Sequence, residues 1–372
     1  MADGSVARQT SRRWFSRLPP VARTSAALRK PARDTVGSSH RPTTGDLVAG
    51  RYRLVRLTGG TQTCSRWVAT DSTREVPVVL EIFGGQPIHA DAPDRLLAEA
   101  RAAMALQHPN AIAVHDLGLT EHDEPFVVTE LLTGETLTDL LERGRRLAPL
   151  FAVRLLLPIA GALSAAHARG IVHGDVKPPN IFLAQTSRGL VPKLTAFGVA
   201  KFEFCEAALD RDLDAPAIVF GSPDYLCPEQ ARGELDAGRW ADAWALCVVL
   251  YECLTGRLPF RDINYRALLR HIAEGPIPPL LDQGVADAGL WKILARGFER
   301  QSSARWQSVL ELGRALAGWL LAHGASDDVC GRPLAATWFE HQRPDEPVLH
   351  RAIDRLDDPF AAARRELEAE EQ

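Results

Sequence analysis

The sequence predicts an α+β protein in which a strand-rich first part precedes a larger, mainly helical part. Apolar and polar residues alternate through much of 52–83, which is the period of half-buried strands. Apolar residues then recur with a helical period across 94–106. Helical patterns dominate after Leu132, and residues 242–254 are apolar on all sides. A helix of that kind is buried on every face and marks the core of the second part.

The elements follow in order from these patterns. Residues 52–57, 66–69 and 76–83 read as strands, because Gly and Asp separate them. The helix at 94–106 carries one apolar face, made by Leu96, Ala100, Ala103 and Leu106. A further helix is predicted at 149–168, but Pro158 lies inside it. Proline has no N–H and clashes with the preceding turn, so this helix should be kinked or split there.

Composition is that of an ordinary globular protein. The chain has 372 residues, 46% of them hydrophobic and 24% charged, with a net charge of −4, so it can bury a sizeable core. No uninterrupted run of about eighteen apolar residues occurs, and we therefore expect a soluble protein without a membrane span. The six cysteines form no CxxC pair, which favours neither a zinc site nor a disulfide framework. A reducing cytoplasm is the expected compartment.

The two ends differ in composition from the middle. Residues 1–45 are rich in arginine with few acidic residues, which predicts a basic disordered arm. This arm could simply solubilise the chain, or it could attract an acidic partner, a lipid surface or nucleic acid. An export or transit signal is a further alternative. At the other end, residues 322–372 form an extension that closes with a charged helix.

Two motifs carry the strongest information about function. One is His-Gly-Asp-Val-Lys-Pro-Pro-Asn at 173–180, and the other is Lys-Leu-Thr-Ala-Phe-Gly at 193–198. Together they resemble the catalytic loop and the metal-binding motif of bacterial serine/threonine protein kinases. The resemblance runs from about residue 52 to 320. It implies a bilobal protein-kinase-like fold, with a small five-stranded antiparallel lobe at 51–132 that includes the family's αC helix, and a larger helical lobe at 133–321.

The phosphate-binding features of that family are degenerate in the small lobe. Phosphoryl transfer needs the nucleotide phosphates to be positioned and their charge neutralised. The family's glycine-rich loop corresponds to residues 59–66, where Gly59 is retained and Arg66 replaces a small valine. Glu81 stands at the position of the phosphate-binding lysine, and the glutamate of the αC helix is Glu99. Two carboxylates about 4 Å apart repel by about 4 kcal/mol at an effective dielectric constant near 20, so we expect an outward αC helix or a protonated carboxyl. The degenerate nucleotide cleft would also include Glu130 and Leu132.

The metal position is also altered, whereas the catalytic positions are retained. Ala196 replaces the family's metal-binding aspartate, and a methyl group cannot bind a hard cation, which prefers oxygen ligands. Asp175 stands at the catalytic-base position, with Lys177 and Asn180 after it. These three either form a poised general base or brace the loop by local hydrogen bonds. We favour bracing, because a base without a phosphate clamp or metal has no oriented substrate.

Regulation by phosphate is excluded in the segment that would be the activation loop. Residues 199–221 contain no Ser, Thr or Tyr, and acidic residues crowd into 203–214. Gly174 stands where the family has the arginine that would bind a phosphorylated side chain. Both the hydroxyl that would be phosphorylated and the arginine that would bind the phosphate are therefore missing. The scaffold positions of the family remain. The resemblance implies an ion pair between Glu229 and Arg305, and an Asp242 that holds the catalytic-loop backbone near His173.

These patterns predict a pseudokinase that acts as a signalling scaffold or allosteric partner, with ATP and magnesium bound weakly or not at all. Its partner would be a protein, such as an active kinase or another protein with a basic surface. One alternative is an atypical kinase or nucleotide-binding protein that uses Asp175 as base and Arg66 in place of the lysine. In another, the basic arm is the functional part and the kinase-like body supports it.

Overall fold

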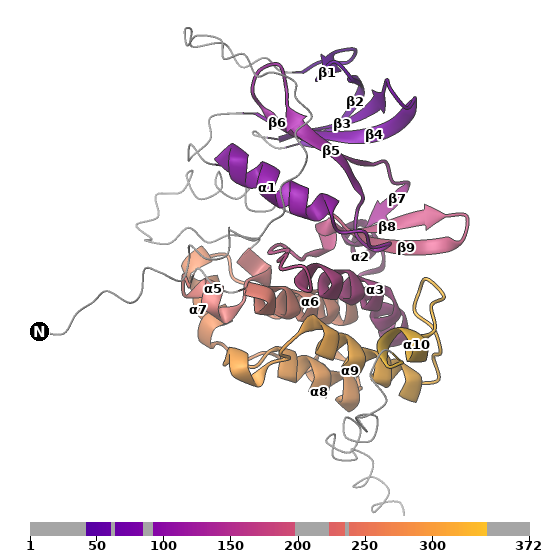
Figure 1. The fold of residues 1–372 in the computed structure, drawn as a ribbon. Coiled ribbons are helices and arrows are strands. Elements are labelled where there is room, and N and C mark those ends of the chain that lie inside the picture. Colours follow the sequence, from indigo (N-terminus) through magenta and orange to yellow (C-terminus); the bar gives the residue numbers. More distant parts are fainter. Residues whose placement is uncertain (1–41, 61–63, 85–91, 198–222, 235–237, 341–372) are drawn as a thin grey trace, which may run out of the picture. The chain divides into compact units, whose positions relative to one another are not determined.

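The computed structural model describes residues 42–60, 64–84, 92–197, 223–234 and 238–340. These residues form a small lobe built on a sheet and a larger lobe built mainly from helices (Figure 1). The predicted basic arm up to residue 41, the acidic segment at 203–214 and the charged C-terminal helix lie outside the described residues.

The small lobe is a six-stranded antiparallel sheet with strand order β1-β2-β3-β4-β6-β5. Its strands are β1 (Leu47–Val48), β2 (Tyr52–Gly60), β3 (Cys64–Asp71), β4 (Val76–Phe83), β5 (Val114–Leu119) and β6 (Pro125–Glu130). The expected five strands are present, and the two-residue β1 is added at the edge beside β2. A strand of two residues is too short to display an alternating pattern, so the sequence could not reveal it.

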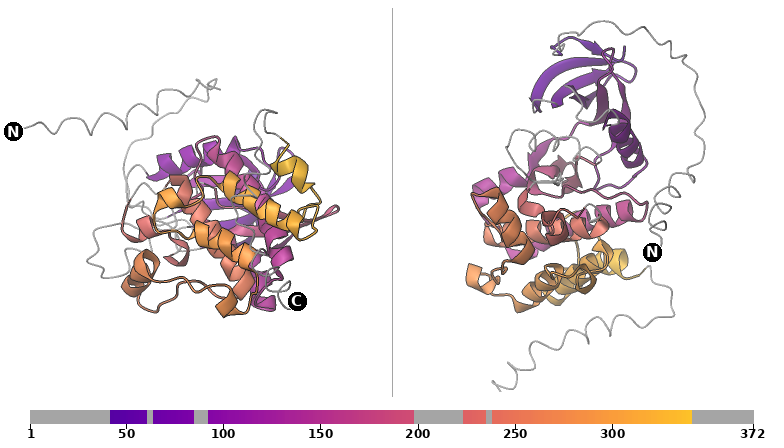
Figure 2. Two further views of the ribbon diagram at one scale, coloured as in Figure 1. Left: turned by 90° about the horizontal axis from the view of Figure 1, so that it is seen from below. Right: turned by 90° about the vertical axis from the view of Figure 1, so that its left-hand side faces the viewer.

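The strand pattern buries one face of this sheet. Tyr52, Leu54, Trp67, Leu80 and Phe126 are all at most 5% exposed and pack together as one cluster. Helix α1 (Ala92–Met104) covers the other face through β5 and β6, as the right-hand view of Figure 2 shows. Its bounds agree with those of the predicted helix at 94–106 to within two residues.

The large lobe begins with a three-stranded sheet of β7 (Gly134–Thr136), β8 (Ile181–Thr186) and β9 (Gly189–Leu194). The remainder is helical. Its α-helices are α2 (Leu137–Gly144), α3 (Pro149–His167), α5 (Pro228–Ala231), α6 (Gly238–Thr255), α7 (Tyr265–Glu274), α8 (Ala288–Gly297), α9 (Val309–Ala322) and α10 (Leu334–Trp338). Short 3₁₀ turns occupy Pro178–Asn180, Pro223–Tyr225, Leu281–Gln283 and Ser302–Ala304.

Helix α6 forms the centre of this lobe, as its all-round apolar composition predicts. Trp244 is fully buried, with Phe298 edge-on at 5.3 Å and Phe260 parallel at 6.2 Å between ring centroids. Helices α3, α8 and α9 all pack against α6. The lobe therefore has one continuous core around a single buried helix.

Helix α3 is not split at Pro158, since it runs without a break from Pro149 to His167. The carbonyl that Pro158 leaves without an intrahelical donor is that of Arg154, four residues earlier. The N–H of Val329 donates to this carbonyl at 3.1 Å. A distant segment thus satisfies the group that proline frees, and the helix can continue through it.

Helix α3 also has the length and hydropathy of a membrane-spanning helix. A search for uninterrupted apolar runs missed it because Arg154 lies in its first half. However, 61% of this apolar window is buried inside the protein, and the helix packs against α6 and α9. These contacts are those of a core helix, so the evidence for a membrane span is weak.

Candidate nucleotide cleft

A cleft of about 970 Å³ lies where the small-lobe sheet meets the large lobe. Several residues singled out in the sequence line it, namely Arg66, Glu81, Glu130, Leu132, Lys177, Asn180 and Ala196. Asp175 and Glu99 are not part of this lining: Asp175 is 8% exposed, and Glu99 is half-buried on α1. The structure therefore gathers most, but not all, of the sequence-predicted residues at one site.

Gly60 is the glycine that lines the cleft, whereas the family resemblance predicts Gly59 at this site. Gly60 has φ of +153°. A Cβ added there would lie 2.2 Å from the backbone oxygen of Cys64. At Gly59 a Cβ would have no atom within 4 Å. Two adjacent glycines cannot be distinguished in this way without the backbone path.

Arg66 and Glu81 form an ion pair across two neighbouring strands. They are direct partners in the β3–β4 register, and Arg66 Nε lies 2.6 Å from Glu81 Oε1. The Glu81 side chain is 12% exposed and that of Arg66 is 51% exposed. The expected repulsion between Glu81 and Glu99 assumed that Glu81 had no cation beside it. Arg66 supplies that cation, so neither an outward helix nor a protonated carboxyl is needed to accommodate Glu81.

The catalytic-loop motif forms a closed polar cluster. Lys177 Nζ lies 2.7 Å from Asp175 Oδ2. The side-chain amide of Asn180 donates to the same oxygen at 2.8 Å and to the Asp175 backbone carbonyl at 2.9 Å. One carboxylate oxygen therefore accepts from both neighbours. This arrangement is what the bracing interpretation expects, and it also keeps the Asp175 carboxyl group at the position that the resemblance gives to a base.

Ala196 lines the cleft in a left-handed backbone conformation, with φ of +61°. Residues other than Gly, Asn and Asp rarely adopt this conformation, because Cβ crowds the backbone. Alanine at this position offers no side-chain oxygen and has a backbone geometry that alanine disfavours. The nearby Phe197 ring lies edge-on to His173, with centroids 4.7 Å apart.

Lys193, on β9, lies outside the cleft lining and pairs with Glu130, which is part of that lining. Lys193 Nζ lies 2.7 Å from Glu130 Oε1, and that oxygen also accepts from the Ala113 N–H at 2.8 Å. Lys193 opens the second of the two sequence motifs, and the sequence alone predicts no partner for it. Thr129 and Phe182 also line the cleft, and nothing in the sequence alone marks them, because they resemble any other residue of a buried strand.

An acidic end of the cleft was also missed from sequence. Asp224 and Glu252 line it together with Tyr225, whose hydroxyl donates to Glu252 Oε2 at 2.7 Å. Burial raises the pKa of both carboxyl groups. These residues come from a 3₁₀ turn and from α6, so only the folded chain places them together.

The backbone of the catalytic loop is held from the central helix α6. Asp242, 1% exposed, accepts hydrogen bonds from the N–H groups of His173 at 2.9 Å and Gly174 at 2.8 Å. The ring of His167 lies 2.7 Å from the same carboxylate. Burial opposes ionisation of Asp242, but these hydrogen bonds outweigh it and lower its pKa. The role expected for Asp242 is therefore visible in its contacts.

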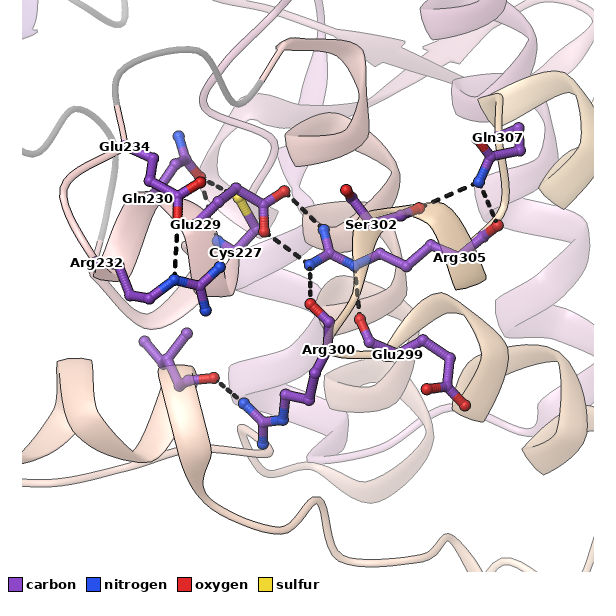
Figure 3. Close-up of polar contacts among 11 residues, drawn as sticks. Cys227, Glu229, Gln230, Arg232, Glu234, Glu299, Arg300, Ser302, Arg305 and Gln307 are labelled. Atoms are coloured by element: carbon purple, nitrogen blue, oxygen red, sulfur yellow. Dashed lines mark hydrogen bonds and ion pairs between the residues drawn. The ribbon is translucent and has the colours of Figure 1, made fainter.

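The expected ion pair between Glu229 and Arg305 is present and bidentate, with both N–O distances 2.7 Å (Figure 3). Arg305 is 2% exposed and also donates to the carbonyls of Glu299 at 2.7 Å and Arg300 at 3.1 Å. Its guanidinium carbon lies 5.0 Å from the ring centroid of Trp244. Burial opposes ionisation of Glu229, and Arg305 outweighs it, so its pKa is lowered.

Comparisons with known proteins agree with this architecture. The model of the protein kinase domain family matches residues 60–305, more than half of the chain. Serine/threonine-protein kinase Pkn1 of Myxococcus xanthus is 34% identical over 82% of this chain and 44% of its own length. PknA of Mycobacterium tuberculosis is 37% identical over 64% of this chain and 54% of its own length. The chain thus spans about half or less of these relatives.

A solved structure gives the same fold. The kinase domain of Mycobacterium tuberculosis PknI superposes with a TM-score of 0.58 at 22% identity, covering 75% of this chain and 99% of that domain. At that identity the likeness concerns the fold alone. With the family match and the motifs in their expected places around one cleft, the chain belongs to the protein kinase domain family, and its relatives include bacterial serine/threonine kinases.

Proposed function

We propose that this chain is a pseudokinase, in which a protein kinase fold is retained for binding and transfers little or no phosphate. The observation that carries the proposal is the Arg66–Glu81 ion pair at 2.6 Å, where the family places a lysine for the phosphates. A carboxylate there repels a triphosphate, and its partner cation is already engaged. Ala196 removes the main anchor for magnesium. The residues present do not fit a magnesium–nucleotide complex, so no transfer step is derived.

The distribution of changes supports a binding role. Asp242, Glu229 and Arg305 keep the contacts that support the large lobe, whereas the departures from the family pattern cluster at the phosphate side of the cleft. On this proposal the chain works in the cytoplasm as a scaffold or allosteric partner for another protein, such as an active kinase or a protein with a basic surface.

The test is thermal stabilisation by ATP with and without magnesium. A ligand at about 100 times its Kd adds about 2.7 kcal/mol to the free energy of unfolding, and we expect no metal-dependent part of any shift. The double variant Glu81→Lys with Ala196→Asp is the matched positive control, because it restores both charges. A wild-type shift that magnesium increases, with phosphate transfer that Asp175→Asn abolishes, would overturn the proposal.

A second candidate is an atypical kinase or nucleotide-binding protein. Two observations favour it: the Asp175, Lys177 and Asn180 cluster is intact, and Arg66 lines the cleft with half of its side chain exposed. Arg66 would then contact the phosphates while Asp175 acts as base. Arg66→Ala separates the two candidates. The atypical enzyme should lose nucleotide affinity by tenfold or more, about 1.4 kcal/mol, and the pseudokinase should show no change.

A further inference from the structure

The chain after α9 folds back over the large lobe. Helix α9 ends at Ala322 and the short α10 covers Leu334–Trp338. Figure 1 shows this segment, in yellow, beside α9. Residues 326–334, which we call the strap, connect the two helices.

The strap is a closed loop with its own internal bonds. The Leu334 N–H donates to the Ser326 carbonyl at 2.8 Å, and Asp327 pairs with Pro333 in an antiparallel bridge. The carboxylate of Asp328, 3% exposed, accepts from the N–H groups of Cys330 at 2.8 Å and Arg332 at 2.9 Å. A buried acceptor that is satisfied only by its own loop fixes the shape of that loop.

One side of the strap is fixed to the core helix α3. The Val329 N–H donates to the Arg154 carbonyl that Pro158 leaves free, at 3.1 Å. The Arg154 guanidinium in turn donates to the carbonyls of Asp327 at 2.9 Å and Asp328 at 3.1 Å. Hydrogen bonds run in both directions between the strap and α3, so the strap is attached to a helix of the core.

The other side of the strap holds the loop that leaves helix α1. Arg332 Nη1 donates to the side-chain oxygen of Asn110 at 2.9 Å, and the Asn110 amide lies 3.6 Å from Cys330 Sγ. Asn110 is fully buried, and its amide also donates to the Pro192 carbonyl at 2.8 Å. Asn110 follows α1 by six residues and precedes β5 by four. The C-terminal part of the large lobe is therefore bonded directly to the connection between α1 and the small-lobe sheet.

We propose that the strap positions helix α1, and with it Glu99, by holding Asn110 through Arg332. Arg154 and Arg332 are then positioning residues. A partner that contacts the strap would change the setting of α1 without entering the cleft. The inference concerns mechanical coupling, so it does not depend on whether the cleft binds nucleotide or transfers phosphate.

The competing explanation is that the segment only completes the core, since Leu334 and Trp338 are buried and α10 packs against α9. The two explanations differ in which residues should respond when one bond is removed. Arg332→Ala removes the bond to Asn110. Arg314→Ala is the matched control, because Arg314 Nε donates to the Trp338 carbonyl of the same segment at 3.1 Å.

The experiment is hydrogen exchange followed by mass spectrometry on the full chain. We expect Arg332→Ala to increase exchange about tenfold in peptides covering 96–113, since a bond from a charged donor to a buried acceptor is lost. Exchange in α6 should stay at the wild-type rate. Arg314→Ala should leave 96–113 unchanged, and Arg332→Lys should restore part of the protection, because one donor remains.

Two results would overturn the proposal. In one, exchange at 96–113 in Arg332→Ala equals that of wild type. In the other, Arg314→Ala accelerates 96–113 as much as Arg332→Ala does, which would indicate general loosening of the segment. Should Arg332→Ala not fold, Arg332→Lys against Arg332→Met gives the same comparison, with faster exchange at 96–113 expected for methionine, which has no donor, and equal exchange contradicting the proposal.

Discussion

Arg66 and Glu81 illustrate how one cross-strand ion pair changes the charge that a cleft presents. Their side chains lie on directly opposed residues of β3 and β4, so they meet without any long-range rearrangement. Because the Arg66 side chain is half exposed, solvent screens the pair and its net stabilisation is below about 1 kcal/mol. Under the proposed function its main effect is on recognition, since the cleft would present a neutralised pair where a free cation would attract phosphate.

Ala196 provides a test of backbone strain in the lining of the cleft. Its left-handed φ of +61° costs about 1–2 kcal/mol for a residue with a Cβ. Ala196→Gly removes this strain. Glycine also raises the conformational entropy of the unfolded chain, which offsets about 0.4–1 kcal/mol of the stabilisation. We expect a net stabilisation of up to about 1.6 kcal/mol, measured by urea unfolding.

The control for this prediction is Ala315→Gly, which lies inside helix α9. There glycine should destabilise by about 1 kcal/mol, because the helix conformation is not strained. Equal destabilisation by the two substitutions would mean that Ala196 does not adopt the left-handed conformation in solution.

The buried pair of Glu229 and Arg305 predicts a dependence of stability on pH. The pKa of Glu229 is lowered in the folded state from its ordinary value of 4.5. Its contribution is therefore complete above that value and is lost as the pH falls through the lower folded-state pKa. We expect the free energy of unfolding to decrease between neutral pH and pH values below 4.5, as measured by urea titrations.

Glu229→Gln isolates the share of this one carboxyl. The variant should lose about 3–5 kcal/mol at neutral pH, because Arg305 is left buried without its counter-charge. It should also lose less additional stability on acidification than the wild type does. If both proteins weaken in parallel with acid, the pH dependence arises from other carboxyls, of which Asp242 is the first candidate.

At the level of whole elements, α9 depends on close contact with α10. Gly313 in α9 leaves room for the Trp338 ring, since a Cβ there would lie 2.2 Å from it. Gly318, five residues later in the same helix, would place a Cβ with no atom within 4 Å. The two glycines are alike in sequence context, and packing alone gives them different roles.

This contrast predicts opposite effects of one substitution. Gly313→Ala should destabilise by about 1–3 kcal/mol, because the added methyl overpacks against Trp338. Gly318→Ala should stabilise by about 0.5–1 kcal/mol, because alanine favours a helix interior. Urea unfolding with tryptophan fluorescence reports both. Two changes of the same sign would show that α10 does not pack on α9 in solution.

For the molecule as a whole, the proposed binding role needs a surface that exists without phosphorylation. The stretch 203–214, outside the described residues, carries Asp210, Asp212 and Asp214. Standing negative charge there favours a partner with an Arg- or Lys-rich surface. Such charges act mainly on the rate of encounter.

Reversal of these three aspartates to lysine should therefore slow association with a purified partner by about tenfold at low salt. It should also reduce the salt dependence of the rate and leave Tm nearly unchanged. The variant with all three aspartates replaced by asparagine is the control for charge removal. Its association rate should lie between those of the wild type and the lysine variant. An unchanged rate and salt slope in the lysine variant would move attention to another surface of the chain.

Much of this protein follows from local sequence. The alternation across 52–83 and the all-round apolar residues of α6 predict the two lobes, because strand and helix periods express burial directly. The Glu229–Arg305 pair and the role of Asp242 follow from family motifs. The tertiary structure alone decides which side chains meet across long distances in the chain. It pairs Arg66 with Glu81 through the β3–β4 register, keeps α3 whole through Val329, and joins Arg332 to Asn110. Such contacts leave no periodic trace in the sequence, because each depends on the path of two segments and not on the pattern of either one.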